Sequence, residues 1–257
     1  MKVFLCFVTV LCALWINPTA GARIHNRIVG GQDITIEQAP YQASLIYHDN
    51  HWCGAVLLRR NFALTAAHCF DVWDFHLFRD VFHIRVGSTF INREGLIATL
   101  IDVTLHPQFN PDTYNFDVAV IQICDCFDWT PRIQPIALPA AFQHTPEGSL
   151  GFVSGWGRLW YQGPIPDILQ AAHMPILNRD RCMETFADIN PLTDSMFCAG
   201  SFYGGLDTCH GDSGGPMVLN GEVIGLVSWG IACAQVDYPG IYTNVSFLRP
   251  WIDQQLP

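Results

Sequence analysis

Three short segments of the sequence contain side chains that together can perform nucleophilic catalysis. They are Leu64-Thr65-Ala66-Ala67-His68-Cys69, Asn115-Phe116-Asp117-Val118-Ala119-Val120 and Gly211-Asp212-Ser213-Gly214-Gly215-Pro216. A serine hydroxyl is a weak nucleophile at neutral pH, so it needs a neighbouring base to remove its proton. An imidazole can be that base, and a carboxylate can hold the imidazole in the required tautomer. These residue types predict a nucleophile at Ser213, a base at His68 and an orienting acid at Asp117.

Each segment also has a purely structural interpretation when it is taken alone. A histidine beside a cysteine is often a packed core residue, an aspartate before an apolar run often starts a strand, and a glycine-rich stretch is often a turn. In the order histidine, aspartate, serine, however, the segments resemble the trypsin-like family of serine peptidases. The resemblance extends from Ile28 to the C-terminus. It implies an oxyanion hole formed by the N–H groups of Gly211 and Ser213, which would stabilise charge that develops in the transition state.

The elements that must position these residues are short and rich in β-structure. Residues 81–86 alternate as a strand does, and residues 222–229 do so in part. Asn220-Gly221 lies between two apolar runs and predicts a tight hairpin, because both residues tolerate positive φ angles. Helical periodicity is clear only over residues 247–256, where we expect Pro250 to lie in the first turn.

Composition and pattern alone predict a β-barrel or a β-sandwich, because the strands are short and the chain contains 21 glycines. We find no repeat, no low-complexity tract and no linker. The resemblance implies more: an all-β fold of two six-stranded antiparallel β-barrels packed together, with the active site between them and a short C-terminal helix. Residues 28–257 are expected to form this single peptidase domain.

The composition restricts the compartment and the partners. The chain has 257 residues, with 13 basic and 23 acidic side chains, so its formal net charge is −10. This balance argues against nucleic acid or an anionic membrane surface as a main partner. Ten cysteines indicate an oxidising compartment. We expect protein or peptide substrates, with protein protease inhibitors as further candidate partners, and a monomer.

The first 22 residues have the pattern of a signal peptide. A basic start is followed by an apolar run over residues 3–16, which is too short to span a bilayer, and then by the small residues 20–22. A membrane anchor is the alternative interpretation. A signal peptide at 1–22 predicts a secreted, extracellular protein that retains eight cysteines.

Arg27-Ile28-Val29-Gly30-Gly31 resembles the activation site of the family. Residues 23–27 would then be an activation propeptide, and cleavage after Arg27 would free the α-amino group of Ile28. The resemblance implies that this ammonium pairs with Asp212, whose buried carboxylate would otherwise be very costly. The precursor should therefore be nearly inactive. An incidental Arg-Ile bond is the alternative.

The resemblance also identifies a specificity pocket. Asp207 corresponds to its base, and a carboxylate at the end of an open slot selects a long basic side chain. Cleavage after Arg or Lys is therefore expected. The alternative interpretation is that Asp207 pairs with an internal cation, although burying such a pair gains little. His210 is expected at the rim. The remaining predicted substrate-binding residues are Thr208, Ser228, Trp229, Gly230 and Gly240.

Three disulfides follow from the resemblance: Cys53–Cys69, Cys182–Cys198 and Cys209–Cys233. Cys124 and Cys126 depart from the family pattern. A strand would place their Cα atoms about 6.6 Å apart, so a mutual bridge needs a local bend. The alternatives are free or adventitiously paired thiols, or a metal site, which would need further ligands.

We expect no cofactor and no metal. Some trypsin-like enzymes hold calcium in an acidic loop, but the corresponding residues 88–95 contain a single carboxylate, Glu94. Asn244-Val245-Ser246 is a glycosylation sequon, and it is open whether it is used.

The function that follows is a secreted zymogen of a serine endopeptidase, cleaving after Arg or Lys through an acyl-enzyme. The main alternative is a catalytically silent homologue that acts as a binding or cofactor protein. Such a protein usually lacks a catalytic residue, and here all three are present. Chymotrypsin-like specificity is a further alternative, which Asp207 disfavours.

Overall fold

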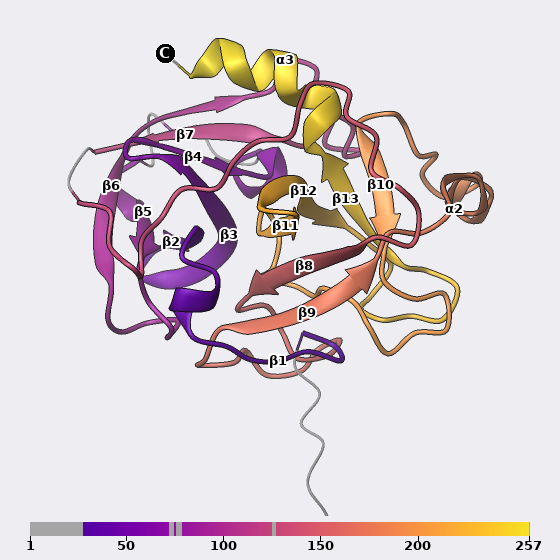
Figure 1. The fold of residues 1–257 in the computed structure, drawn as a ribbon, viewed down its shortest axis with the longest axis horizontal. Helices are drawn as coiled ribbons and strands as arrows, with labels where there is room; N and C mark the ends of the chain where they lie inside the picture. Colours follow the sequence, from indigo (N-terminus) through magenta and orange to yellow (C-terminus); the bar gives the residue numbers. More distant parts are fainter. Residues whose placement is uncertain (1–27, 72–74, 76–78, 125–126, 257) are drawn as a thin grey trace, which may run out of the picture.

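The computed structural model describes residues 28–71, 75, 79–124 and 127–256 (Figure 1). The predicted signal peptide, the predicted propeptide with Arg27, and Cys126 lie outside these residues. Among the described residues, no helix has the length and apolar character that crossing a membrane requires.

Six antiparallel strands close into a barrel in the N-terminal half of the chain. The order around it is β2-β3-β4-β7-β6-β5. Residues 82–86 of the alternating segment form β5, and Phe82, Ile84 and Val86 face the barrel core. The strands are β2 (Gln42–Tyr47), β3 (Asn50–Arg59), β4 (Phe62–Thr65), β5 (Phe82–Val86), β6 (Leu96–Leu105) and β7 (Ala119–Ile123).

The C-terminal half forms a curled sheet of seven strands rather than a second closed barrel. Its order is β1-β9-β8-β11-β12-β13-β10, so the expectation of two closed six-stranded barrels is wrong for this half. The sheet stays open because its edge strands β1 and β10 pair with β9 and β13 and not with each other. The strands are β1 (Gln32–Asp33), β8 (Leu150–Gly155), β9 (Gln170–Pro175), β10 (Met196–Ala199), β11 (Pro216–Leu219), β12 (Glu222–Trp229) and β13 (Gly240–Asn244).

The predicted hairpin joins β11 to β12. Asn220 and Gly221 occupy the turn with φ angles of 52° and 80°, the left-handed conformation that favours Asn and Gly. Figure 1 shows the closed barrel beside the second sheet, with the C-terminal helix lying across one end of both.

The C-terminal helix α3 (Val245–Gln255) is longer than predicted, and Pro250 is inside it rather than in its first turn. A proline there leaves the carbonyl of Ser246 without its helical donor. The N–H of Phe142 donates to that carbonyl at 2.9 Å, so a distant loop replaces the missing bond. The helix α2 (Arg179–Phe186) has no counterpart in the sequence prediction. Short 3₁₀ turns are η1 (Ile36–Gln38), η2 (Ala67–Cys69) and η3 (Arg79–Val81).

Strand register places two of the three sequence segments together. Thr65, at the end of β4, pairs with Ala119, at the start of β7. His68 follows the first strand and Asp117 precedes the second, so both side chains lie at the same end of the barrel. A core cluster that includes Leu64, Trp156 and Val245 joins the barrel, the sheet and α3.

Candidate functional site

His68 and Asp117 are in direct contact. The Nδ1 atom of His68 lies 2.8 Å from Oδ2 of Asp117, and the His68 backbone N–H donates to Oδ1 at 2.9 Å. Burial disfavours the charged imidazole, but the adjacent carboxylate outweighs it, so the pKa of His68 is raised. Asp117 is 1% exposed. The pair therefore presents an imidazole whose Nδ1 carries the proton and whose other nitrogen is available as a base.

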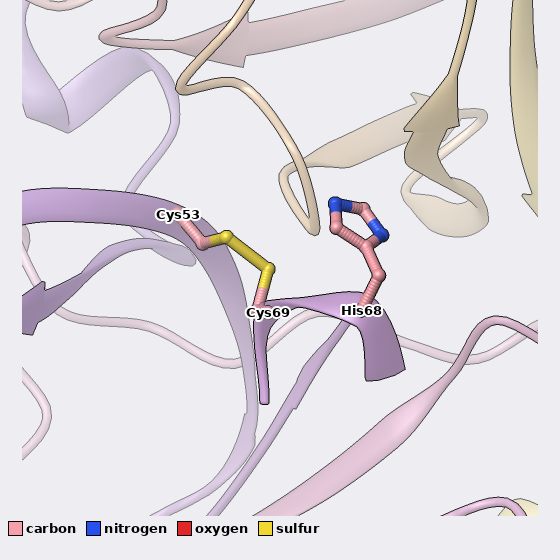
Figure 2. Close-up of side chains that lie close together, drawn as sticks. All are labelled: Cys53, His68 and Cys69. Atoms are coloured by element: carbon pink, nitrogen blue, oxygen red, sulfur yellow. A yellow bond between two sulfur atoms is a disulfide. The ribbon is translucent and has the colours of Figure 1, made fainter. Parts of the chain in front are cut away.

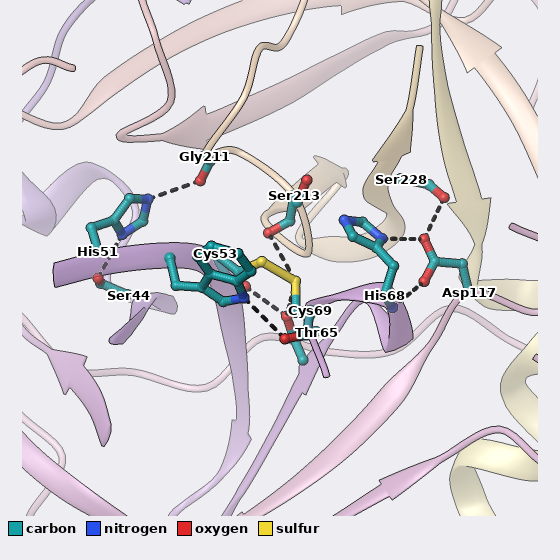
Figure 3. The surroundings of a disulfide bond; sticks show 12 residues. Ser44, His51, Cys53, Thr65, His68, Cys69, Asp117, Gly211, Ser213 and Ser228 are labelled. Atoms are coloured by element: carbon teal, nitrogen blue, oxygen red, sulfur yellow. Dashed lines mark hydrogen bonds and ion pairs between the residues drawn. A yellow bond between two sulfur atoms is a disulfide. The ribbon is translucent and has the colours of Figure 1, made fainter. Parts of the chain in front are cut away.

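The second sheet holds Asp117 from two further sides. The hydroxyl of Ser228 donates to Oδ2 at 2.5 Å, and that of Thr243 donates to the Asp117 carbonyl at 2.7 Å. Figure 3 shows the carboxylate between His68 and Ser228. Ser228 is predicted above only as a pocket wall. The contact with Asp117 joins residues 111 positions apart, and no local sequence signal indicates it.

Ser213 lies on the loop before β11, and it shares a cavity with His68. The Ser213 carbonyl accepts a hydrogen bond from the N–H of Gly54 at 2.7 Å, which ties this loop to the barrel. Gly214 adopts φ +75°, and a side chain there would meet Thr65 and backbone atoms at less than 3 Å. No hydrogen bond joins Ser213 to His68 among the described residues. In unliganded sites of this kind such bonds are often long and shorten when a substrate binds.

The N–H groups of Gly211 and Ser213 donate to no other backbone group in the described part of the chain. Gly211 has φ +99°, a conformation that favours glycine. Its carbonyl lies 2.8 Å from Nε2 of His51, whose Nδ1 is 2.7 Å from the hydroxyl of Ser44 (Figure 3). Burial lowers the pKa of His51 to about 4, so this ring is neutral at pH 7. The N–H groups of Gly211 and Ser213 are thus on a loop whose Gly211 carbonyl is in contact with the neutral ring of His51.

The cavity that contains His68 and Ser213 has a volume of about 290 Å³, and Asp207 also lines it. Asp207 is 3% exposed, and its carboxylate accepts the N–H groups of Thr208 and Ala234, each at 2.8 Å. Burial raises its pKa to about 7. No cation pairs with Asp207 among the described residues, so the structure offers no support for an internal ion pair.

The predicted pocket residues line this same cavity. A side chain at Gly240 would lie 2.4 Å from the Asp207 carboxylate, and one at Gly230 would be in ordinary contact with backbone atoms of Ala232 and Gly240, each at 3.9 Å. His210 is exposed at the rim, 6.0 Å from the ring of Tyr161. A larger cavity, of about 610 Å³, lies elsewhere, beside the start of α2 and α3, and neither His68 nor Ser213 lines it. The cavity residues are His68, Tyr114, Asp207, Thr208, Cys209, His210, Ser213, Val227, Ser228, Trp229, Gly230, Ala232 and Gly240.

Asp212 and Ile28 are both completely buried. The Asp212 carboxylate accepts the N–H groups of Gly157 at 2.8 Å and Cys209 at 2.9 Å, and burial raises its pKa to about 6. It has no cationic partner in the described chain. Val29, next to Ile28, accepts a backbone hydrogen bond from Asp207 at 3.2 Å. The predicted new N-terminus therefore lies against the same loop as the acid that it is expected to meet.

The structure contains the three expected disulfides, Cys53–Cys69, Cys182–Cys198 and Cys209–Cys233. Cys124 is also disulfide-bonded, so it is not a free thiol. Figure 2 shows the Cys53–Cys69 bridge beside His68. Two clusters bring a histidine close to two cysteines, namely Cys53/His68/Cys69 and Cys209/His210/Cys233. Since the sulfurs of both pairs are bonded to each other, neither cluster offers the thiolates that bind metal.

Glu94, the single carboxylate of residues 88–95, and Asn244 of the sequon both interact with other side chains or backbone groups of the protein. The Glu94 carboxylate pairs with Arg132 at 2.6 Å. The Oδ1 atom of Asn244 accepts the hydroxyl of Ser246, and its Nδ2 donates to the Asp194 carbonyl. Asn244 thus caps α3, a role that the sequon pattern does not reveal.

Comparison with known proteins decides the family. The trypsin family model matches residues 28–252. The chain belongs to the trypsin family of serine proteases. It is 39% identical over 230 residues to a vitellin-degrading protease of Bombyx mori, a match that covers 90% of this chain and 86% of that protease.

Two further relatives of this trypsin-family chain carry the name trypsin. A trypsin of Phaedon cochleariae is 36% identical, over 89% of this chain and 88% of its own length. Trypsin 5G1 of Aedes aegypti is 34% identical, over 90% of this chain and 86% of its own length. The closed barrel, the curled second sheet and the C-terminal helix are consistent with the trypsin fold.

Proposed function

We propose that the chain is the secreted zymogen of a serine endopeptidase that cleaves peptide bonds after Arg or Lys. The observation that carries this proposal is one cavity. It is lined by Ser213, by His68, which is hydrogen-bonded to Asp117, and by Asp207, whose carboxylate has no cationic partner among the described residues. The proposed product of this arrangement is an acyl-enzyme on Ser213.

In the proposed reaction, His68 removes the proton from Ser213 Oγ as that oxygen attacks the peptide carbonyl. The N–H groups of Gly211 and Ser213 then stabilise the oxyanion, and His68 returns the proton to the leaving amine. Water, activated by the same histidine, releases the acyl group. Asp117 keeps the imidazole in the required tautomer and stabilises its charged form.

The proposed specificity for Arg and Lys rests on the charge of the Asp207 carboxylate, which a basic substrate side chain would neutralise. The Asp207 carboxylate is 3% exposed and has backbone donors but no cation among the described residues, so it is costly when ionised. A substrate guanidinium or ammonium would supply the missing charge, whereas an apolar side chain would leave the carboxylate uncompensated. A side chain at Gly240 would collide with the Asp207 carboxylate, so the glycine there leaves this carboxylate accessible to a long substrate side chain.

The proposed activation uses the same reasoning at Asp212. Its buried carboxylate has two backbone donors and no cation, and Ile28 is buried in the neighbouring core. Cleavage after Arg27 would supply the α-ammonium of Ile28 as the partner. Side chains at Gly155 or Gly157 would collide with the Asp212 carboxylate, so these glycines leave room for it. We assign residues 1–22 as signal peptide, 23–27 as propeptide and 28–257 as the peptidase domain.

A cleavage-profile assay tests the proposal. The activated protein is incubated with a mixed peptide library, and the cut positions are read by mass spectrometry, with Ser213→Ala and Asp207→Ser as matched variants. We expect cleavage after Arg and Lys by the wild type and none by Ser213→Ala. We expect Asp207→Ser to lose cleavage after Arg by at least about 100-fold, since an uncompensated charge would enter the pocket.

The same assay separates the alternative function. A catalytically silent homologue would leave the library intact although the protein is folded and cleaved after Arg27. Equal cleavage by the wild type and Ser213→Ala would contradict the catalytic assignment, and wild-type-like hydrolysis after Arg by Asp207→Ser would contradict the pocket assignment.

A further inference from the structure

The segment that leads into Asp117 has a strained backbone. Tyr114 and Phe116 have φ angles of 55° and 56°, although neither is a glycine or an asparagine. Such residues seldom adopt the left-handed conformation, because the β-carbon meets the backbone there. Strain of this kind persists only where surrounding contacts impose it, and it occurs most often at functional sites. The positive φ angles of Tyr114 and Phe116 therefore indicate that contacts of residues 114–116 impose this conformation.

The side chains of the two strained residues contact two different histidines. The Tyr114 ring lies edge-on against the His68 ring, with the centroids 5.3 Å apart. The Phe116 ring stacks on the buried His106, at 4.7 Å and 13° between planes. This arrangement directs the intervening Asn115 toward the second sheet.

Asn115 is the point at which the segment binds that sheet. Its Oδ1 atom accepts hydrogen bonds from the hydroxyls of Thr193 and Ser195, each at 2.7 Å. The Ser195 hydroxyl also accepts the N–H of Phe116 at 3.2 Å. Ser195 is 1% exposed, and its carbonyl accepts the N–H of Asn244 at the end of β13. The donors to Asn115 thus lie on the segment that leads into β10, and a backbone hydrogen bond from β13 ties Ser195 to the second sheet.

Three hydroxyl groups, located in or immediately before neighbouring strands of the second sheet, donate hydrogen bonds to residues 115 and 117. Ser228 of β12 donates to the Asp117 carboxylate, and Thr243 of β13 donates to its carbonyl. Ser195, immediately before β10, donates to Asn115. Since β12, β13 and β10 are neighbours in the sheet, the three hydroxyls form one row along the segment.

We propose that Asn115 is a positioning residue, which fixes Asp117 against His68 by binding the Thr193 and Ser195 hydroxyls of the second sheet. The catalytic part of this inference rests on the proposed function, whereas the geometric part does not. Without the Asn115 acceptor, the strained segment relaxes and the Asp117 carboxylate moves relative to the imidazole. Asp207 and its backbone donors Thr208 and Ala234 belong to other elements and keep their arrangement, whereas Tyr114 of this segment lines the cavity beside His68.

The charged groups around His68 make the effect measurable. Asp117 and Asp71 both favour the charged imidazole, and the Tyr114 ring covers one side of it. Loosening Asp117 weakens the larger of the two carboxylate interactions. The pKa of His68 should therefore move to lower pH in an Asn115→Ala variant.

Steady-state kinetics on an arginyl amide test the catalytic part. We expect Asn115→Ala to lower kcat about tenfold, in line with the loss of its hydrogen bonds, and to change KM less than twofold. Asn115→Asp keeps the accepting oxygen and should restore most of kcat. Asn110→Ala is the matched control, because Asn110 caps the turn of the same segment through Asp112 and Thr113 without contacting the second sheet. It should retain wild-type kcat.

An NMR titration of His68 in the Ser213→Ala background tests the geometric part without any activity. A shift of the His68 titration to lower pH in Asn115→Ala, and not in Asn110→Ala, supports the proposal. An unchanged titration with unchanged kcat overturns it. A lower melting temperature in both asparagine variants with no change at His68 would also overturn it, because a purely structural role predicts that result. A wild type that is folded, cleaved after Arg27 and inactive would instead refute the proposed function.

Discussion

Ser228 and Asp117 come from the two different halves of the fold, and the Ser228 hydroxyl lies 2.5 Å from the Asp117 carboxylate. The contacted oxygen, Oδ2, is the one that also lies 2.8 Å from His68 Nδ1. Asp117 is thus fixed by the barrel through His68 and by the second sheet through Ser228. The proposed catalytic unit requires that both halves be packed together.

The Ser228 contact gives the first prediction. Ser228→Ala should lower kcat about tenfold, because a buried hydrogen bond to a charged group is lost and Asp117 is held less firmly. Steady-state kinetics on an arginyl amide would measure this. Ser154→Ala is the control, since that buried hydroxyl bonds Gln42 away from the cavity. Equal kcat in the wild type and Ser228→Ala would show that the contact is catalytically irrelevant.

Asp207 should couple ligand binding to pH. Its pKa is raised to about 7, and a bound cation favours the ionised form, so binding should expel a proton. Below pH 7, the affinity for benzamidine, which imitates the arginine head group, should fall about tenfold per pH unit. Calorimetry in buffers of different ionisation enthalpy would detect the proton. The same dependence should persist in His68→Ala, and a constant affinity from pH 5 to pH 8 would rule out this coupling.

Activation should require cleavage after Arg27. We expect Arg27→Gln to remain uncleaved and at least about 100-fold less active than the processed wild type, because Asp212 stays uncompensated. N-terminal sequencing and an arginyl amide assay would follow both properties. Processed Asp212→Asn should be cleaved normally yet also lose activity. Full activity of an intact Arg27→Gln precursor is the result that excludes this mechanism.

The mature chain should digest itself slowly. Loss of the proposed signal peptide would remove Lys2, and loss of the proposed propeptide would remove Arg23 and Arg27. The remaining chain would contain ten arginines and no lysine, with a net charge of −13. Few peptide bonds of this chain then match the proposed specificity for Arg and Lys. Drift in composition is the alternative explanation of the small number of basic residues. Gln162 lies in an exposed loop, so Gln162→Lys should create a new cleavage after residue 162, whereas Gln162→Glu should not. Rapid fragmentation of the wild type at its arginines, followed by gel electrophoresis, would contradict the hypothesis.

The features that could be predicted from the sequence are local ones. The Asn220-Gly221 turn and the strand at residues 82–86 follow from backbone preference and alternation over a few residues. The three segments that contain His68, Asp117 and Ser213 are recognisable because each is contiguous. Strand register then explains why His68 and Asp117 meet, since Thr65 pairs with Ala119.

The features that could not be predicted depend on distant partners. Pro250 is accommodated inside α3 because Phe142, more than 100 residues away, donates to the carbonyl that the proline leaves free. Closure of the second sheet depends on whether its two edge strands meet, and no local pattern encodes this. The hydroxyls of Ser228, Thr243 and Ser195 reach the Asp117 segment from 79 to 126 positions away.

The central claim is that Ser213 forms a covalent acyl-enzyme within this cavity. The most direct measurement is to mix the processed protein with an arginyl ester, stop the reaction with acid within milliseconds, and examine the digested protein by mass spectrometry. We expect the acyl mass on the peptide that contains Ser213, and none in Ser213→Ala. An adduct on another residue, or no adduct while the ester is hydrolysed, would contradict it.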